Sequence, residues 1–534
     1  MRSGKGWEWM LCAGVLAGAL ALRLPRLAQR PMHGDEANQA VRTGLLLEEG
    51  VYHYDPTDHH GPSLYFAAWP FCRASSRTFA GTTEWPYRLV PVTFSLLTLL
   101  IMLAMGVSSR QGLFANRSAR FAALLGMAVS PAMVYYSRFF IQETMLVTFL
   151  AGMLLCAVRY AGLRAGEAAG ERRDGRRAVR AAAGFGAFAG LAVATKETAV
   201  LSFAAAAAAA VAACGVDRLR RAWRTRDAAV AAGVAIGVAA LLFSSFFTYP
   251  RGVVDALFST VQAYVTRATA VPEHQHPWNF YLKILFWFRY GRGPLWSEAA
   301  LLAPALPAAA MAFFRFPEAR GEEAARVRWV RFLAVYTLVL TLLYSAIPYK
   351  TPWCALSFLH GVILLAGMGV GQAVAWLSRQ KARGVRRAGV AAVWALVALL
   401  AGRHAAQACR ACFRLPADPR NPYVYAHTGT DALNLVAAIH EAARAAQGYD
   451  TPIAVAVPAP DTWPLPWYLR AYKRVGYWTR VEQIPDAFRP VVVVAAADQG
   501  DVADARFGAG RRASFYGIRP GVLLNLFAPA PPRP

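Results

Sequence analysis

The chain has 534 residues, 56% of them hydrophobic, and a mean hydropathy of +0.31. A soluble protein of this length would be less apolar, and several apolar stretches reach the roughly 17–25 residues that cross a bilayer. The net charge of +26 comes mostly from arginines between those stretches. Nucleic-acid binding would need a basic patch with stacking aromatics in a soluble domain, so we expect no nucleic-acid partner.

Hydrophobic stretches recur along the first three quarters of the chain and predict about eleven transmembrane helices. The two stretches at residues 181–195 and 332–347 are short for a bilayer. The predicted spans are residues 8–24, 86–107, 119–136, 140–158, 181–195, 198–215, 228–247, 295–314, 332–347, 353–377 and 389–402. We therefore expect an α-helical polytopic membrane protein whose transmembrane domain is residues 1–402.

Clusters of arginine and lysine fall between alternate predicted spans. Such clusters mark cytoplasmic loops, so this side of the membrane is predicted to be the cytoplasm. The clusters are at residues 164–180, 218–226, 315–331 and 379–387. Four regions are then expected outside the cell membrane: residues 25–85, the turn at 195–198, residues 248–294 and everything after about 403.

The chain changes character after the last predicted span. Residues 431–447 read as an amphipathic helix, and residues 453–457 and 491–496 read as short buried strands. This pattern predicts a small extracytoplasmic α/β domain within residues 403–534, which is a usual domain size. The Pro-rich segment at residues 528–534 is expected to be a frayed end.

Asp35 and Glu36 stand side by side just after the first predicted span, at the start of the first outer loop, residues 25–85. Carboxylates close to hydrocarbon are costly, so such a pair is expected to be functional. Apolar residues with helical spacing follow and predict a helix on the outer leaflet with Asp35 as its N-cap. Asp35 and Glu36 are our candidate catalytic residues, and the alternative is that Asp35 only caps the helix.

The same loop carries four of the ten histidines, including the neighbours His59 and His60. An imidazole can donate a hydrogen bond to a sugar or a phosphate, or join carboxylates around a divalent metal. The spacing matches no fixed zinc pattern. His59 and His60 are candidate substrate-binding residues, and whether a metal is present stays undecided.

Arg138 lies between the third and fourth predicted spans, and Glu143 lies near the start of the fourth, on the predicted outer side. Glu143 falls at the start of an otherwise apolar helix, where a charged side chain needs a partner. Two interpretations are open: Glu143 binds substrate, or it forms a salt bridge with Arg138.

Lys196 and Lys350 are two further cations on the predicted outer side. A lysine at the membrane interface is a good point charge for a phosphate, although it can also serve only as an anchor. With Arg138 these lysines form a set of cations that would suit a lipid-linked phosphate leaving group beside a general base.

This arrangement resembles the GT-C membrane glycosyltransferases, especially the group that includes the protein O-mannosyltransferases and the aminoarabinose transferases. That group has an acidic residue early in its first outer loop, a His-Pro-Pro-Leu-like element later in the loop, a Ser-Arg element followed by an acid, and a Gly-Leu-Ala-x-x-Thr-Lys element. The matching segments here are Asp35-Glu36, His60-Gly61-Pro62-Ser63-Leu64, Ser137-Arg138 through Glu143, and Gly190-Leu191-Ala192-Val193-Ala194-Thr195-Lys196.

The chain also resembles, in several short sequence segments, a prokaryotic subgroup whose archaeal members are named flippase-activity-associated proteins. The segments that carry this likeness are His33-Gly34-Asp35-Glu36, His60-Gly61-Pro62, Tyr349-Lys350-Thr351-Pro352-Trp353 and Asn421-Pro422-Tyr423-Val424-Tyr425. Here Gly61 departs from the wider group's pattern, which leaves the acceptor class open.

The resemblance implies an inverting glycosyltransferase of the inner (cell) membrane whose active site faces outside. It implies a polyprenyl-phosphate-linked sugar as donor and an acceptor that is a glycan, a lipid or a protein. Asp35 would be the general base, and Arg138, Lys196 and Lys350 would bind the donor phosphate. Glu36 and Glu143 would orient the acceptor or hold a divalent metal. The alternative is a non-catalytic partner in the translocation or assembly of lipid-linked oligosaccharides.

Overall fold

The computed structural model describes residues 3–55, 60–106, 112–168, 170, 175–258, 274–314 and 321–529. The chain divides into two compact units. The transmembrane unit comprises Met1–Pro25, Val51–Leu64 and Leu89–Arg414, and the second unit comprises Arg26–Gly50, Tyr65–Arg88 and Leu415–Pro534. The segments that flank residues 51–64 of the first predicted outer loop thus group with the C-terminal region.

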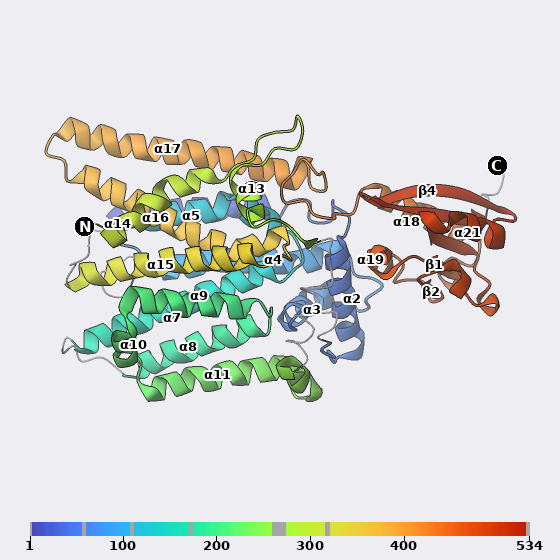
Figure 1. Ribbon diagram of the computed structural model, residues 1–534, viewed down its shortest axis with the longest axis horizontal. Helices are drawn as coiled ribbons and strands as arrows, with labels where there is room; N and C mark the ends of the chain where they lie inside the picture. Colours follow the sequence, from blue (N-terminus) through green and yellow to red (C-terminus); the bar gives the residue numbers. More distant parts are fainter. Residues whose placement is uncertain are drawn as a thin grey trace. The chain divides into compact units, whose positions relative to one another are not determined.

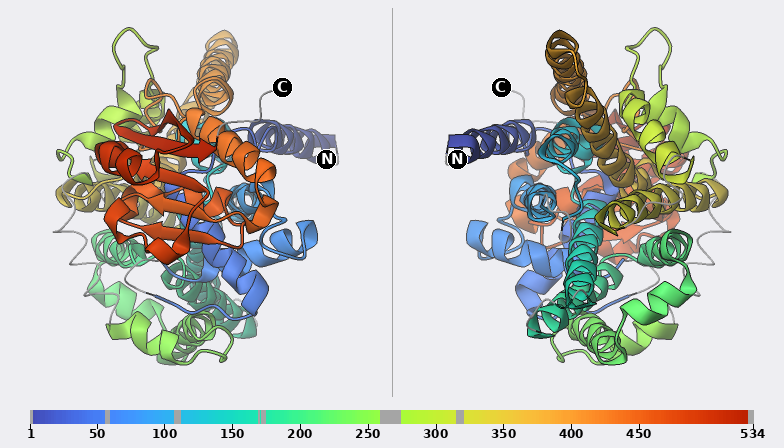
Figure 2. Two further views of the ribbon diagram at one scale, coloured as in Figure 1. Left: turned by 90° about the vertical axis from the view of Figure 1, so that its right-hand side faces the viewer. Right: turned by 90° about the vertical axis from the view of Figure 1, so that its left-hand side faces the viewer.

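The transmembrane unit is a bundle of helices (Figure 1), and the right-hand view of Figure 2 looks along them. Its best-packed neighbours are α8 with α7 and α11, α9 with α15, and α16 with α5 and α14. Its helices are α1 (Ser3–Arg23), α4 (Glu84–Ala104, in this unit from Leu89), α5 (Arg117–Val129), α6 (Pro131–Tyr136), α7 (Glu143–Ala168), α8 (Gly175–Val193), α9 (Ala199–Cys214), α10 (Val216–Ala222), α11 (Thr225–Phe243), α13 (Phe280–Phe286), α14 (Leu302–Phe314), α15 (Gly321–Ala346), α16 (Leu356–Ser378) and α17 (Arg383–Cys409).

Each of the eleven predicted spans overlaps one helix of this unit or, at residues 119–136, two helices. Among the described residues, six helices are long and apolar enough to cross a membrane by length and composition: those at Glu84–Ala104, Glu143–Glu167, Thr225–Phe243, Glu323–Ala346, Pro352–Ser378 and Arg383–Arg414. The pair α9 and α10, bent by 103°, would make a seventh. The chain is therefore an integral membrane protein.

Several helix boundaries differ from the prediction, and two of the differences have a clear local reason. Helix α15 begins at Gly321, not near 332, because its first turns carry arginines that apolarity alone assigns to a loop. The predicted span 119–136 is two helices, since Ser130 caps α6 with Pro131 in its first position. Proline is well tolerated there because its missing N–H would be unpaired anyway.

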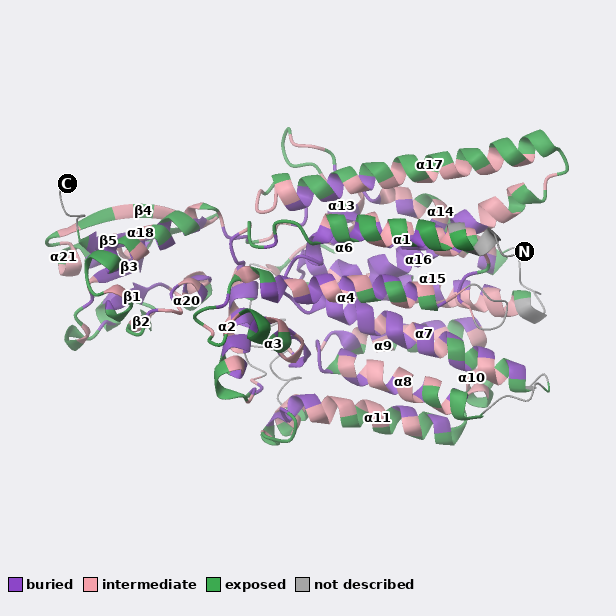
Figure 3. Ribbon diagram, turned by 180° about the vertical axis from the view of Figure 1, so that it is seen from behind, coloured by how far each residue is buried: buried purple, intermediate pink, exposed green. Residues whose placement is uncertain are grey.

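Helices α16 and α17 differ most in burial (Figure 3). Helix α16 is buried along most of its length, whereas only three residues at the end of α17 are buried. Glycines let α16 approach its neighbours closely: a Cβ at Gly369 would lie 1.9 Å from the Pro304 carbonyl oxygen. Helix α16 is thus the centre of the bundle, and α17 lies at its edge.

The second unit contains α2 (Gly34–Glu49), most of α3 (Ser63–Ser75), the first turn of α4 and a small α/β domain. Its five-stranded sheet has the order β2-β1-β3-β5-β4, with β1 parallel to β2 and β3, and β5 antiparallel to β3 and β4. The domain's elements are α18 (Asp431–Ala445), β1 (Ile453–Ala456), α19 (Ala459–Thr462), α20 (Leu465–Tyr468), β2 (Val475–Trp478), β3 (Val492–Ala496), α21 (Gly500–Phe507), β4 (Arg511–Arg519) and β5 (Val522–Pro529).

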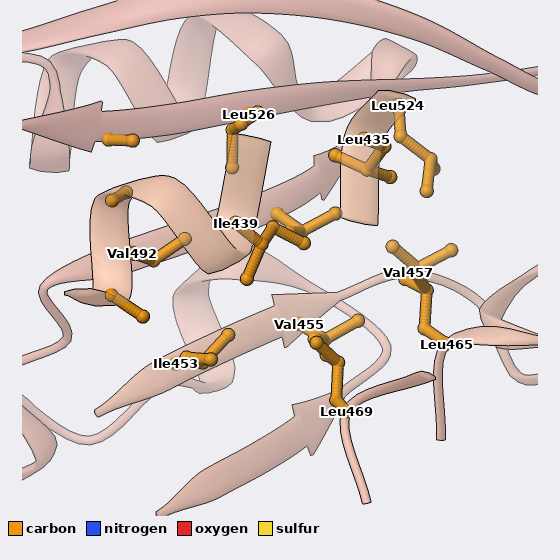
Figure 4. Close-up of a cluster of buried hydrophobic side chains, with 14 of the residues drawn as sticks. Leu435, Ile439, Ile453, Val455, Val457, Leu465, Leu469, Val492, Leu524 and Leu526 are labelled. Atoms are coloured by element: carbon orange, nitrogen blue, oxygen red, sulfur yellow. The ribbon is translucent and has the colours of Figure 1, made fainter. Parts of the chain in front are cut away.

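The core of this domain lies between α18 and the sheet (Figure 4). Leu435 and Ile439 of α18 pack among Val455 of β1, Val492 of β3 and Leu524 of β5, all fully buried. Strands β1 and β3 are buried along their whole length, which is typical of parallel strands covered on both faces.

The predicted helix and both predicted strands of this domain are confirmed as α18, β1 and β3. The hairpin of β4 and β5 was not predicted. The prediction that the chain frays from residue 528 is wrong for its first two residues, because Ala528 and Pro529 end β5. Strand β4 carries three arginines and one glycine, so its sequence lacks the alternating apolar pattern of a half-buried strand.

Candidate active site

Helix α2 begins with a reciprocal cap in the second unit. His33 is its N-cap residue, and the His33 Nδ1 atom accepts a hydrogen bond from the Asp35 backbone N–H at 3.0 Å. In return, Glu36 Oε2 accepts from the His33 backbone N–H at 3.1 Å. The prediction that Asp35 is the N-cap is therefore wrong by two residues, because the His33 ring supplies the accepting atom.

Glu36 is fully buried between two arginines. Arg88 donates to both of its carboxylate oxygens, from Nε to Oε1 at 2.9 Å and from Nη2 to Oε2 at 2.8 Å, and Arg30 donates to Oε2 at 2.8 Å. Arg88 also donates to the backbone carbonyls of Leu27, Arg30 and Pro31. The carboxylate thus ties the chain before α2 to the first turn of α4.

Asp35 is placed differently from its neighbour, with half of its side chain exposed to solvent. Its Oδ2 atom lies 3.8 Å from His33 Nδ1, and burial lowers the pKa of the His33 ring. Since Nδ1 accepts a hydrogen bond and Nε2 faces the Tyr425 carbonyl at 2.9 Å, this ring is neutral. Asp35 is therefore the carboxylate of the pair that a reactant can reach.

In the transmembrane unit, residues 60–63 dock on the turn between α8 and α9. The Ser63 N–H donates to the Ala194 carbonyl at 2.9 Å, and the Ser63 and Thr195 hydroxyls lie 2.7 Å apart. A Cβ at Gly61 would lie 2.3 Å from the Ala194 oxygen, so only glycine fits this approach. The docked segment brings His60 to Glu197.

His60 and Glu197 form a half-buried pair. His60 Nδ1 lies 2.7 Å from Glu197 Oε1 and 2.9 Å from Oε2, and it donates because a carboxylate only accepts. Burial acts to raise the pKa of Glu197, but His60 and the neighbouring Lys196 lower it to about 2. The carboxylate stays ionised and orients the imidazole.

Lys196 lies in the same turn and is almost fully buried. Its ammonium donates to Oε1 of Glu143, the first residue of α7. Burial acts to lower the pKa of Lys196, but the Glu143 carboxylate outweighs it and raises that pKa well above the usual value. Glu143 therefore forms a salt bridge, but its partner is Lys196, whereas the sequence interpretation named Arg138. Within the described part of the chain, Glu143 Oε2 has no hydrogen-bond donor.

The other two candidate cations also lie buried in the transmembrane unit. Arg138 donates from Nη1 to the Arg23 carbonyl at 2.5 Å, and its guanidinium lies 4.8 Å from the centre of the Phe413 ring. Lys350 donates to the carbonyls of His276, at 2.9 Å, and Ile347, at 2.5 Å. Each cation therefore already has acceptors from the protein.

His59 lies outside the described residues. Among the residues that are described, no three His, Cys, Asp or Glu side chains gather as a metal site would require. Sequence reasoning missed the partners Arg88 and Glu197. Arg88 falls inside a predicted span, and a buried arginine there needs a carboxylate, which was a signal for Glu36.

The chain matches no protein-family model and no curated protein sequence. Solved structures do match. ArnT from Cupriavidus metallidurans, bound to undecaprenyl phosphate, has a TM-score of 0.63 at 13% identity and covers 98% of each chain. The Archaeoglobus fulgidus oligosaccharyltransferase tethered to an acceptor peptide with an NVT sequon has a TM-score of 0.59 at 13% identity, over 92% of this chain and 69% of that one.

The chain has the GT-C fold. A third match, the archaeal oligosaccharyltransferase AglB from Archaeoglobus fulgidus with an inhibitory peptide and a dolichol-phosphate, has a TM-score of 0.58 at 12% identity over 99% of this chain and 75% of that one. The predicted fold class, a polytopic helical membrane protein with a small C-terminal α/β domain, is confirmed. At these identities the likeness concerns the fold.

Proposed function

We propose that this protein is an inverting glycosyltransferase that moves a sugar from a polyprenyl-phosphate donor to an acceptor outside the cytoplasm. The observation that carries the proposal is the match over 98% of both chains to an ArnT structure that holds undecaprenyl phosphate. The acceptor peptide in the oligosaccharyltransferase structure supports an acceptor on the same fold. The inner membrane and an outward-facing site belong to the same proposal.

Asp35 is the general base of this reaction. It takes the proton of the acceptor hydroxyl, whose oxygen forms a bond to the anomeric carbon while the bond from that carbon to the phosphate oxygen breaks. The polyprenyl phosphate leaves with the electron pair. The exposed side chain of Asp35 supports this role, whereas Glu36, bound by Arg88 and Arg30, holds the helix that carries Asp35.

Arg138, Lys196 and Lys350 bind the donor phosphate, which needs cations where charge develops as it leaves. His59, His60 and Glu143 contact the substrates. The Nε2 atom of His60 keeps a lone pair when Nδ1 donates to Glu197, and Glu143 Oε2 is a buried acceptor. Both atoms suit sugar hydroxyls, which donate hydrogen bonds.

The test is transfer by purified protein from a polyprenyl-phosphate-linked sugar, with Asp35→Asn as the variant. This change keeps the shape and removes the base, so transfer should fall by about 10²–10⁴-fold. Glu49→Gln, at the other end of α2 and exposed, is the matched control and should retain activity. Activity near wild type in Asp35→Asn would remove Asp35 from the mechanism. A wild-type protein that binds no such lipid would favour the non-catalytic partner in lipid-linked oligosaccharide translocation.

A further inference from the structure

An apolar pocket of about 520 Å³ lies inside the transmembrane unit, among α5, α14, α16 and α17. It arises because α16 packs closely on α5 and α14, while α17 is buried only near its end at Cys409. The middle of α17 therefore stands away from the bundle (Figure 3). One face of α17 lines the pocket, with the spacing i, i+3, i+4, i+7, i+8, i+11: Val393, Leu396, Val397, Leu400, Ala401 and His404.

Hydrocarbon is the natural content of this pocket. Its other walls are mostly alanines, glycines, prolines and aliphatic side chains, among them Ala308 of α14 and Gly367 of α16, and they also include Gln372 and Trp376. Apolar cavities exclude water, and a cleft between membrane helices is surrounded by lipid chains. The described residues that line the pocket include no lysine or arginine. An ionised phosphate therefore finds no counter-charge there.

His404 adds one buried polar group to this otherwise mostly apolar pocket. Its side chain is 3% exposed, and in the described part of the chain its Nε2 atom has no hydrogen-bond partner. A neutral imidazole carries its proton on Nδ1 or on Nε2, and with the proton on Nδ1 the Nε2 atom can only accept a hydrogen bond. A buried acceptor is costly unless a donor reaches it.

We infer that this pocket binds a lipid whose hydrocarbon chain lies along α17 and whose hydroxyl group donates a hydrogen bond to His404 Nε2. A hydroxyl supplies the donor that the ring lacks, and a phosphate oxygen does not, because it accepts. The site thus differs in chemistry from that of the proposed phosphorylated donor. It does not depend on whether the protein transfers sugar.

The experiment uses a long-chain alcohol that carries a mid-chain photoreactive diazirine, with the full-length protein in nanodiscs. Peptides labelled on irradiation are identified by mass spectrometry. We expect labelling on α14 and α17 that unlabelled long-chain alcohol displaces about 3- to 10-fold more strongly than its methyl ether, the preference given by one hydrogen bond. Polyprenyl phosphate should displace it weakly.

Three variants separate the parts of the inference. Ala401→Phe fills the pocket and should abolish labelling there, whereas Ala395→Phe, on the exposed side of α17, should not. His404→Phe keeps the ring volume, so the probe should still bind but with alcohol and ether equally effective. Labelling that is indifferent to Ala401→Phe, or equal competition by alcohol and ether in wild type, would overturn the inference. Stronger displacement by polyprenyl phosphate would assign the pocket to the donor's chain instead.

Discussion

Replacing Glu36 by glutamine tests how the second unit holds the start of α2. The carboxylate receives hydrogen bonds from Arg88 Nε and Nη2, Arg30 Nη2 and the His33 N–H. Glutamine has one accepting oxygen and turns an NH₂ group toward an arginine. The variant therefore leaves buried guanidinium groups without their counter-charge.

Removing one partner of a buried ion pair costs about 3–5 kcal/mol. We expect the lower end of that range here. Arg88 keeps three carbonyl acceptors, those of Leu27, Arg30 and Pro31, at 2.6, 2.9 and 3.0 Å. A cost of about 3 kcal/mol raises the population of the locally opened segment roughly 100-fold.

Limited proteolysis measures that population when opening is fast relative to cleavage. Trypsin cleavage after Arg42, inside α2, should accelerate about 100-fold in Glu36→Gln at low protease concentration. Glu49→Gln has the same chemistry at an exposed position of the same helix and should change the rate less than twofold. If Glu36→Gln resists trypsin as well as wild type does, the arginine pair contributes nothing measurable and Glu36 returns as a candidate reactant.

Three further predictions follow from the same structure. Burial lowers the pKa of His33 and takes that of His427 well below its usual value. The unfolded chain therefore binds protons below about pH 6.5 that the folded chain does not. As the pH decreases below that value, the free energy of unfolding should fall by up to about 1.4 kcal/mol per pH unit for each histidine. Thermal unfolding between pH 5 and 8 measures this, and a flat profile would contradict the buried neutral rings. Alanine at Arg138 or Lys196 should weaken binding of a polyprenyl-phosphate sugar by about one to two decades, measured by titration. If both folded variants bind as wild type does, the phosphate site lies elsewhere. A reporter fused after Pro534 should be active only if exported, and a cytoplasmic signal would reverse the predicted orientation.

The helices and their order could be predicted because apolar length alone decides which segments enter a bilayer. The break at Lys196 and Glu197 was predicted for the same reason, since two charges interrupt an apolar run. The start of α15 was not predicted, because its arginines lie in a helix that continues past the apolar segment. Strand β4 was not predicted either, because it forms by pairing with β5 and its own sequence lacks a strand pattern.

The sequence indicated which residues are candidates for the site, but it indicated less well what each of them does. Asp35 and Glu36 are neighbours in sequence, yet one is half exposed and the other is enclosed by Arg88, which follows it by 52 positions. His60 meets Glu197 over 137 positions. No local spacing encodes such partners. Only the charge of a residue inside an apolar segment indicates that a partner must exist.

The existing bonds of the three cations determine what a donor phosphate would gain from each. Lys350 and Arg138 donate to backbone carbonyls, which are neutral acceptors, so turning either cation to a phosphate would leave no charge without its counter-charge. Lys196 is different, because taking it from Glu143 would leave a buried carboxylate without its counter-charge, at about 3–5 kcal/mol. A phosphate must therefore bind Lys196 beside Glu143, through the ammonium hydrogens that remain. It follows that Lys196→Ala alone confounds phosphate binding with loss of the fold. Lys196→Met combined with Glu143→Gln removes both charges together and keeps an amide oxygen that can accept from a sugar hydroxyl. Weaker donor binding in that double variant would therefore report loss of the Lys196 cation.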